Sequence, residues 1–185
     1  MPQRADARRN YARILAVAQD EVAAHGADAS LEQIARVAGV GSATVRRHFP
    51  TRHALLTAVS RHRIEALCAR AEELAGAENG RAALLEWMDE VVAYCVDARG
   101  LAEAIAYDGD IHENSCSAAL EEAARPLLRD GAVAHGVTVA DLIALAVGVV
   151  MATSHHPEPL RQSRHLFRLA AAGFSPGDLD GRSSV

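Results

Sequence analysis

Hydrophobic residues in the first sixty positions recur every three or four residues, which is the period of an amphipathic helix. Residues 9–25 carry such a stripe, and Gly26 follows it. A second, shorter stripe covers 31–38, where Ser30 followed three residues later by Gln33 forms a capping-box pattern. The apolar positions of the two predicted helices are Tyr11, Ile14, Leu15, Ala18 and Val22, and then Leu31, Ile34, Ala35 and Ala38.

A third short helix is predicted over 43–49. Ser42 is its expected N-cap, and Pro50 ends it because proline cannot donate the next helical hydrogen bond. The glycine-containing turn 39–41 separates it from the second helix. Two short helices joined by such a turn are typical of a helix-turn-helix.

The pattern stays helical along the rest of the chain. A long fourth helix, capped by Thr51, is predicted to run to about Ala75. The other predicted helices are 82–98, stopped by Gly100; a short one over 101–107; one over 117–135 that Pro126 kinks or divides; 139–153, capped by Thr138 and Asp141; and 160–172. A loop is expected over 108–115. No segment has the alternation of a strand, so the predicted fold class is all-α.

Composition agrees with helices and divides the chain electrically. The 185 residues are 50% hydrophobic but only 4% aromatic, with Ala, Leu and Val dominating. The net charge of −5 is unevenly distributed along the chain. Residues 1–63 contain ten Arg and five acidic residues, whereas 64–185 contain nine Arg and nineteen acidic residues. A basic N-terminal third followed by an acidic remainder suggests a domain that binds a polyanion, joined to a second domain with a different function.

Several classes of protein are disfavoured. No apolar stretch is long enough to span a membrane, and the arginine-rich start is not a secretory signal, so a cytoplasmic protein is expected. Cys68, Cys95 and Cys116 are too few and too widely spaced for a disulfide framework. The chain has no phosphate-binding glycine loop, GxSxG or HExxH motif, so we predict neither an enzyme nor a cofactor.

A metal-sensing function is a weaker alternative. His112 and Cys116 have the spacing of one helix face, and Cys95, His135, His155 and His156 could add ligands. Residues 108–115 are expected to form a loop, however, and adjacent histidines cannot share one helix face. We therefore predict no metal site and favour an organic ligand.

The N-terminal third resembles the TetR family of bacterial transcriptional regulators. The resemblance rests on the runs 13–18, 30–40 and 44–52, with Gly26 and Leu55-Leu56 at the matching spacings. It implies DNA binding, a dimer, and a ligand cavity in a C-terminal helical bundle. Arg46 replaces the usual Tyr of the family pattern, which leaves its DNA contact open, whereas Arg52 replaces the usual Lys and keeps the charge.

The start of the recognition helix carries the candidate DNA contacts. Its N-terminal residues meet base edges in a helix-turn-helix, and basic side chains meet phosphates. The candidates for base edges are Ser42, Ala43 and Thr44; those for phosphates are Arg46, Arg47, His48 and Arg52, with Arg4, Arg8 and Arg9 in an N-terminal arm. Arg8, Arg9 and Arg36 could equally be solvated surface residues that do not contact DNA. His48 is equally suited to contact DNA or to support the end of the helix by packing.

The C-terminal body carries the candidate ligand and dimer residues. Aromatic and sulfur side chains suit a small, largely apolar ligand, although each alone also fits a core. The candidates are Trp87, Met88, Val91, Tyr94, Cys95, Ile105, Tyr107, His112 and Cys116, with the loop 108–115 as a gate or a simple connection. Small and apolar residues over 139–153, together with 160–172, suit a homodimer interface or, alternatively, a buried central helix.

The sequence thus predicts a helix-turn-helix DNA-binding domain over 1–52, a regulatory and dimerisation domain over 53–174 and a flexible tail over 175–185. The fourth helix, about 52–75, links the two domains. The predicted function is a homodimeric transcriptional repressor released from a palindromic operator by a small organic effector. The alternative is a regulator of the same fold without an effector, controlled by a protein partner or by abundance.

Overall fold

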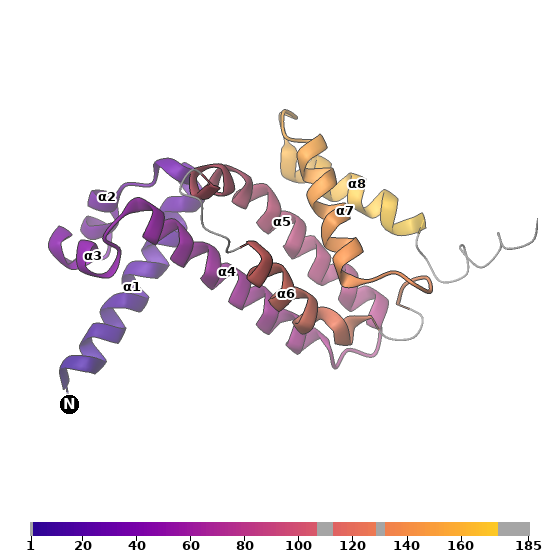
Figure 1. Cartoon of the computed structure of the whole chain (residues 1–185), viewed down its shortest axis with the longest axis horizontal. Coiled ribbons are helices and arrows are strands. Elements are labelled where there is room, and N and C mark those ends of the chain that lie inside the picture. Colours follow the sequence, from indigo (N-terminus) through magenta and orange to yellow (C-terminus); the bar gives the residue numbers. More distant parts are fainter. Residues whose placement is uncertain (1, 107–112, 129–131, 174–185) are drawn as a thin grey trace, which may run out of the picture. The chain divides into compact units, whose positions relative to one another are not determined.

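The computed structural model describes residues 2–106, 113–128 and 132–173, and these form helices and turns without a strand (Figure 1). The helices are α1 (Pro2–His25), α2 (Leu31–Val37), α3 (Ser42–His48), α4 (Arg52–Leu74), α5 (Gly80–Ala106), α6 (Glu113–Ala124), α7 (Val139–Ala152) and α8 (Pro159–Gly173), with 3₁₀ turns at Gly26–Asp28 and Arg125–Leu127. The predicted all-α fold is confirmed. No helix in these ranges is long and apolar enough to cross a membrane.

The described residues divide into two compact units. The N-terminal unit contains residues 2–63 and 97–106, and the C-terminal unit contains 64–96, 113–128 and 132–173. Helices α4 and α5 therefore contribute to both. In the N-terminal unit Asp97 on α5 accepts a hydrogen bond from Arg63 on α4 at 3.0 Å. The boundary expected after residue 52 stays a prediction.

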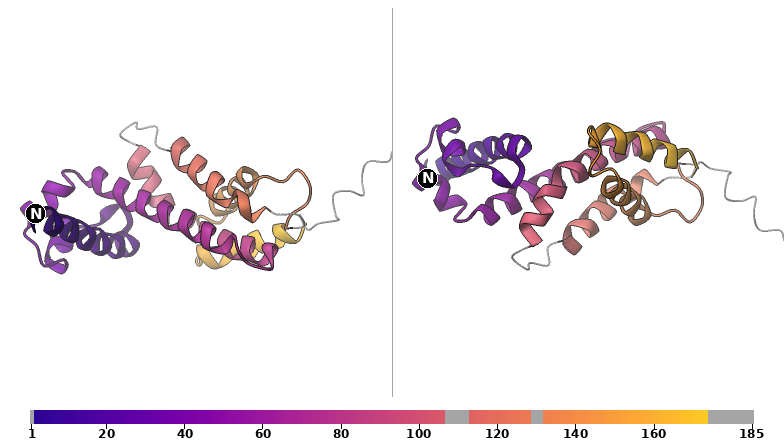
Figure 2. Two further views of the ribbon diagram at one scale, coloured as in Figure 1. Left: turned by 90° about the horizontal axis from the view of Figure 1, so that it is seen from below. Right: turned by 90° about the horizontal axis from the view of Figure 1, so that it is seen from above.

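The N-terminal unit is built from α1, α2, α3 and the start of α4, which group together in both views of Figure 2. Its core is a contiguous apolar cluster that includes Ile14, Leu15, Val22, Ile34, Val45, Phe49, Leu55 and Val59. The cluster members on α1 and α2 are positions of the predicted helical stripes, of which Tyr11 and Leu31 are only partly buried. Burying one face of each short helix against the others stabilises helices too short to be stable alone.

Local capping explains where the short helices begin. The Ser30 side chain accepts a hydrogen bond from the Gln33 amide at 3.2 Å, which is one half of the predicted capping box. Glu21 on α1, instead of Gln33, accepts from the Ser30 amide at 3.3 Å. Ser42 is not a cap: α3 begins at that residue, and Gly41 is the N-cap, without a side-chain hydrogen bond. The Gly41 carbonyl accepts from the Thr44 amide at 2.8 Å, which closes the first turn.

Two glycines determine the turns before α2 and α3. Gly26 and Gly39 have φ angles of 58° and 62°, in the left-handed region that only glycine adopts without strain. Pro50 follows the end of α3 as predicted. Thr51 then caps α4, because its hydroxyl accepts from the Ala54 amide at 3.0 Å.

Three predictions about the middle of the chain are wrong. Gly100 does not stop a helix, since α5 is one helix from Gly80 to Ala106. A glycine inside a helix costs only about 1 kcal/mol, which a long packed helix absorbs. Residues 113–115, predicted as loop, begin α6, and α6 ends at Ala124 instead of continuing to His135. Pro126 lies in the 3₁₀ turn that follows, where its missing amide hydrogen breaks the helical ladder.

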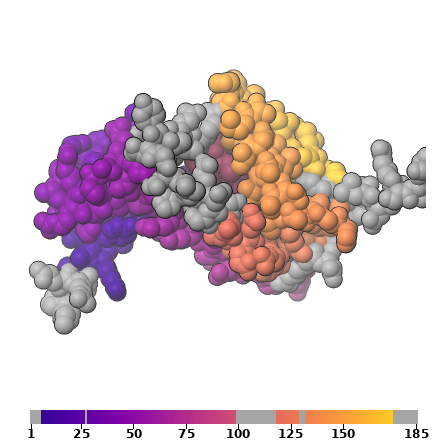
Figure 3. Space-filling view, viewed as in Figure 1, coloured from indigo at the N-terminus to yellow at the C-terminus, as the bar shows by residue number. Residues whose placement is uncertain are grey.

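The C-terminal unit packs α4, α5, α6, α7 and α8 around a second core. This core includes Leu67, Leu84, Trp87, Met88, Val91, Leu120, Leu127, Leu142, Val150 and Phe167. Helix α7 lies along the viewed surface of this unit (Figure 3). Its predicted cap is confirmed: the Thr138 hydroxyl accepts from the Asp141 amide at 3.2 Å, and Asp141 accepts from the Thr138 amide at 2.9 Å.

Candidate nucleic-acid interface

Helix α3 has one buried and one exposed side. Val45 and Phe49, four residues apart, are fully buried in the N-terminal core. Ser42, Ala43, Arg46 and Arg47 are exposed, and Thr44 and His48 are half-buried. The seven residues of α3 thus present the predicted base-edge and phosphate candidates on the side that its buried residues leave free.

Aromatic contacts support the end of α3 against α1. The Tyr11 ring lies 5.4 Å from the Phe49 ring and 5.7 Å from the His48 ring, the latter edge to face. Such pairs add packing energy beyond the area they bury. His48 therefore has a structural partner, which supports one of its two alternatives, while its DNA contact stays a prediction.

Two of the candidate phosphate contacts are in ion pairs. Arg46 Nη2 lies 2.9 Å from Glu32 Oε1, which joins α3 to α2. Arg52 Nη1 lies 3.7 Å from Asp28 Oδ1. Within the described ranges, the Arg47 side chain takes part in no hydrogen bond or ion pair. Sequence reasoning missed Glu32 and Asp28, because pairs fourteen or more residues apart have no local signature.

The electrostatic environment of Glu32 favours its charged form. A hydrogen bond from its own backbone amide, followed by that from Arg46, lowers the pKa of the Glu32 carboxyl below its ordinary value. Glu32 is also in the first turn of α2, where the helix dipole stabilises a negative charge. The carboxylate is therefore ionised at neutral pH.

The arginines expected in an N-terminal arm lie in a helix. α1 begins at Pro2 instead of Arg9, so residues 4–9 form its first turns. Arg9 forms an ion pair with Asp6, and Arg36 on α2 donates to Gln33. These local pairs support the solvated-surface alternative for Arg9 and Arg36. Arg8 is exposed on the same helix.

The candidate ligand residues on α5 are partly in the second core. Trp87, Met88 and Val91 are fully buried, and the indole Nε1 of Trp87 donates to the Leu67 carbonyl at 2.9 Å. Tyr94 and Cys95 are half-buried beside this core, and burial raises the pKa of the Cys95 thiol to about 11. Tyr107 and His112 lie outside the described residues, and so do the side chains of Ile105 and Cys116.

No metal centre is visible in the part of the chain that the structure describes. Within those residues no three His, Cys, Asp or Glu side chains lie together in a group that could hold a metal ion. The His112 and Cys116 pair falls outside the described side chains.

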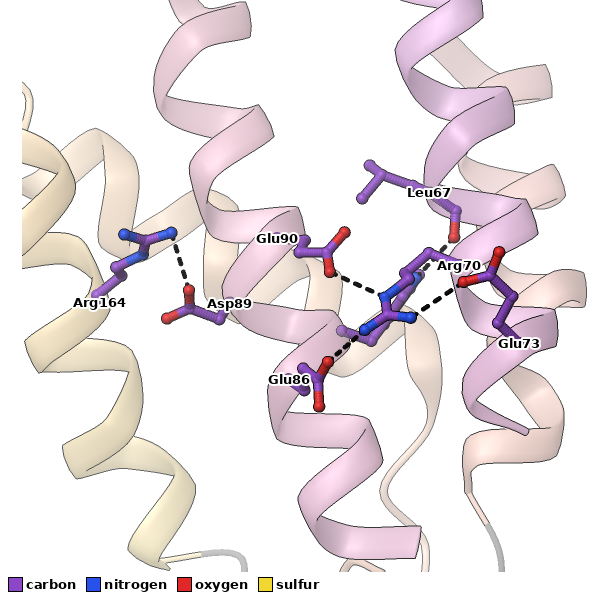
Figure 4. A network of polar contacts seen from close by, with 8 residues as sticks. Leu67, Arg70, Glu73, Glu86, Asp89, Glu90 and Arg164 are labelled. Atoms are coloured by element: carbon purple, nitrogen blue, oxygen red, sulfur yellow. Dashed lines mark hydrogen bonds and ion pairs between the residues drawn. The ribbon is translucent and has the colours of Figure 1, made fainter. Parts of the chain in front are cut away.

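Ion pairs missed by sequence reasoning join neighbouring helices of the C-terminal unit (Figure 4). Arg70 on α4 lies 3.0 Å from Glu73 and 3.2 Å from Glu90, and also pairs with Glu86. These hydrogen bonds raise the pKa of the Arg70 guanidinium. On the other side of α5, Asp89 lies 2.9 Å from Arg164 and 3.1 Å from Arg168 of α8. Asp89 and Glu90 thus link α5 to α8 and α4.

The two candidate dimerisation helices are α7 and α8. They pack against each other within the C-terminal unit, and large apolar side chains remain outside that packing. The exposed fractions are 44% for Val147, 59% for Met151 and 59% for Leu169. Ala140, Ala144 and Gly148 are exposed on α7 as well, so small residues accompany these side chains.

Comparisons with known proteins match both parts of the chain. The family model described as bacterial regulatory proteins, tetR family, covers residues 14–59. The model described as transcriptional regulator SbtR-like, C-terminal domain, covers residues 79–176, which extends the resemblance well beyond the N-terminal third. No curated protein matches the sequence significantly.

Solved structures agree over nearly the whole chain. A TetR transcriptional regulator from Streptomyces coelicolor is 29% identical with a TM-score of 0.75, covering 90% of this chain and 99% of that one. A TetR transcription regulatory protein from Mycobacterium vanbaalenii is 35% identical with a TM-score of 0.69, covering 94% of this chain and 99% of that one. The chain belongs to the TetR family of bacterial transcriptional regulators.

Proposed function

We propose that this TetR-family regulator is a homodimeric repressor that binds a palindromic operator through α3 and is released by a small organic effector. The observation that carries the DNA-binding part is the exposed side of α3. It combines two arginines with small and hydroxyl side chains, while Val45 and Phe49 anchor the helix from behind. A protein that binds an operator must reach the bacterial DNA, so we propose a cytoplasmic location.

The residues of the interface divide by chemistry. Ser42, Ala43 and Thr44 at the start of α3 meet base edges, where a methyl or hydroxyl group can contact thymine or accept and donate hydrogen bonds. The proposed phosphate contacts are Arg46, Arg47, His48 and Arg52. Phosphate contacts fix the register of the protein on DNA, and base contacts carry its sequence preference.

The proposed dimer forms through α7 and α8. Exposed large apolar side chains beside small ones support it, because such a surface packs closely against an identical helix pair. A two-fold axis then pairs two recognition helices with half-sites about 34–36 Å apart, one turn of DNA. In this proposal residues 1–52 bind DNA and 53–174 regulate and dimerise.

The proposed effector site involves the α5 residues Trp87, Val91, Tyr94 and Cys95, with Tyr107, His112 and Cys116 as further candidates. The half-buried Tyr94 and Cys95 beside an apolar core suit a small, mainly apolar molecule. Such an effector releases DNA if it binds more tightly to a conformation with another separation of the recognition helices.

A regulator without an effector is the second candidate. It is favoured by the complete burial of Trp87, Met88 and Val91 and by the satisfied Trp87 indole, which indicate a filled core around these residues. A partner protein or cellular abundance then controls DNA binding.

The decisive test is a fluorescence titration of the purified protein against its own upstream intergenic DNA and against a scrambled duplex, at two salt concentrations. Preference for the upstream DNA with a stoichiometry of one dimer per site supports the proposal. The double substitution Arg46→Ala and Arg52→Ala abolishes binding if these residues carry the phosphate contacts. Equal binding to both duplexes contradicts an upstream operator.

A further inference from the structure

Two of the three arginines proposed to contact phosphates, Arg46 and Arg52, are each paired with a carboxylate of the same unit. Glu32 lies 2.9 Å from Arg46, and Asp28 lies 3.7 Å from Arg52. The acidic residues come from the segment before the recognition helix, and the basic ones from α3 and from the start of α4. Part of the positive charge of this surface is therefore neutralised within the protein.

The closer pair is held in place by the backbone and remains open to solvent. Ile34 on α2 and Val45 on α3 are both fully buried in one core, which fixes the two helices against each other. The side chains of Arg46 and Glu32 are nevertheless 61% and 67% exposed. Glu32 thus stays within reach of Arg46, while nothing buries either group.

We propose that Glu32 competes with DNA phosphates for Arg46 and thereby sets the affinity of this surface for DNA of any sequence. The inference rests on the proposed function, in which α3 binds DNA. An arginine bound to a carboxylate must exchange that partner for a phosphate. The released carboxylate then faces a DNA backbone of the same charge, which costs further free energy.

The competition acts equally on specific and non-specific DNA, because phosphates are present in both. Base contacts by Thr44 do not involve Glu32, so sequence preference stays the same. Non-specific DNA is in large excess in a cell, and its binding depends almost entirely on phosphate contacts. An internal competitor for Arg46 therefore weakens binding to specific and non-specific sites by the same factor and leaves the ratio of the two affinities unchanged.

Replacement of the carboxylate by an amide tests the proposal. Glu32→Gln removes the charge and keeps the size of the side chain. We expect about threefold tighter binding to both the upstream and the scrambled duplex at low salt, as exposed charge pairs contribute modestly. The gain decreases as salt screens the charges. Asp20→Asn is the matched control, since Asp20 is an exposed acidic residue of α1, and this variant should bind as the wild type does.

A double-mutant cycle separates competition from a simple change of net charge. In an Arg46→Ala background Glu32→Gln should give a clearly smaller gain, because the arginine that the carboxylate holds is absent and only the repulsion between the carboxylate and the phosphates is removed. An equal gain with and without Arg46, an equal gain in Asp20→Asn, or no gain in Glu32→Gln overturns the proposal. Circular dichroism and thermal unfolding verify that each variant is folded.

A heparin column makes the test independent of the operator. Heparin is a polyanion without base sequence, so its retention of the protein reports the availability of Arg46. Glu32→Gln should elute at higher salt than the wild type, and the double variant should differ less from Arg46→Ala than Glu32→Gln differs from the wild type. Identical elution of Glu32→Gln and wild type overturns the competition. Failure of the wild type to prefer upstream DNA instead contradicts the operator proposal alone.

Discussion

Thr153 and Ser163 share a buried hydrogen bond of 2.6 Å that joins the end of α7 to α8. Both side chains lie within a largely apolar unit, with Ser163 fully buried. The Thr153 hydroxyl also lies 2.9 Å from the Val149 carbonyl and 3.2 Å from the Val150 carbonyl, so it has an acceptor in its own helix. This contact thus links the C-terminal end of α7 to α8 in a largely apolar surrounding.

Replacing either partner should destabilise the C-terminal unit by different amounts. Thr153→Val leaves the Ser163 hydroxyl buried without this partner, which costs about 1–3 kcal/mol of unfolding free energy. Ser163→Ala leaves Thr153 bonded to the α7 backbone and costs about 1 kcal/mol. Urea unfolding measures both, with the half-buried Ser154→Ala as control. Equal losses in all three variants contradict a specific role for the pair.

Substitutions in α3 and α4 should distinguish residues that contact bases from residues that contact phosphates. Thr44→Ala should change sequence preference, because Thr44 lies at the start of the recognition helix. Arg52→Ala should weaken binding to every duplex alike and reduce the salt slope of log affinity by about one, the contribution of one phosphate contact. Titrations of both variants on several duplexes at several salt concentrations make the comparison. The same loss of discrimination in both variants contradicts this division.

The α7 cap should make stability depend on pH in the acid range. Hydrogen bonds from the Thr138 hydroxyl and amide lower the pKa of the Asp141 carboxyl below its ordinary value of 3.8. Since the folded pKa is the lower one, the stabilisation is fully present above the unfolded pKa. It is lost as pH falls through the folded pKa. Asp141→Asn should therefore have a lower Tm at pH 7, and the difference from wild type should shrink below pH 4.

Thermal unfolding by circular dichroism at several pH values tests this expectation. Glu158→Gln is a suitable control, because Glu158 is an exposed carboxylate just before α8, outside the capping box. A Tm difference between Asp141→Asn and wild type that stays constant down to pH 3 is the result that contradicts the cap as its origin.

The short helices and turns of the N-terminal unit could be predicted from sequence because their signals are local, whereas the start of α1 at Pro2 and the contribution of α5 to this unit could not. Ser30 and Thr51 cap the helices that follow them, and Gly26 and Gly39 adopt the left-handed conformation that their turns require. The one-residue error at Ser42 reflects a cap formed by the Gly41 backbone alone, which no side-chain pattern reveals.

The remaining differences depend on packing between distant residues. Glycine often ends a helix, yet α5 continues through Gly100 because a single glycine costs the helix little free energy. The carboxylate beside Arg46 and the three around Arg70 come from residues on neighbouring helices. A sequence pattern assigns charged residues to a helix face, but it does not say which face of the next helix they meet.

The exposed apolar side chains of α7 and α8 should be required for the dimer. Met151→Glu and Leu169→Glu each introduce a charge at a surface that the proposed dimer buries, where an unpaired charge is costly. Both variants should be monomeric at micromolar concentrations in sedimentation or light-scattering measurements. They should also bind a palindromic site more than tenfold more weakly, because a monomer contacts only one half-site.

Val37→Glu is the matched control for these dimer variants. Val37 is 60% exposed on α2, as exposed as Met151 and Leu169, but it belongs to the N-terminal unit. An equal loss of the dimer in all three variants indicates a general effect of surface charge or unfolding. A dimer that persists in both Met151→Glu and Leu169→Glu places the interface elsewhere. Loss confined to the α7 and α8 variants makes these helices the dimer interface, since the control introduces the same charge at an equally exposed apolar position of the other unit.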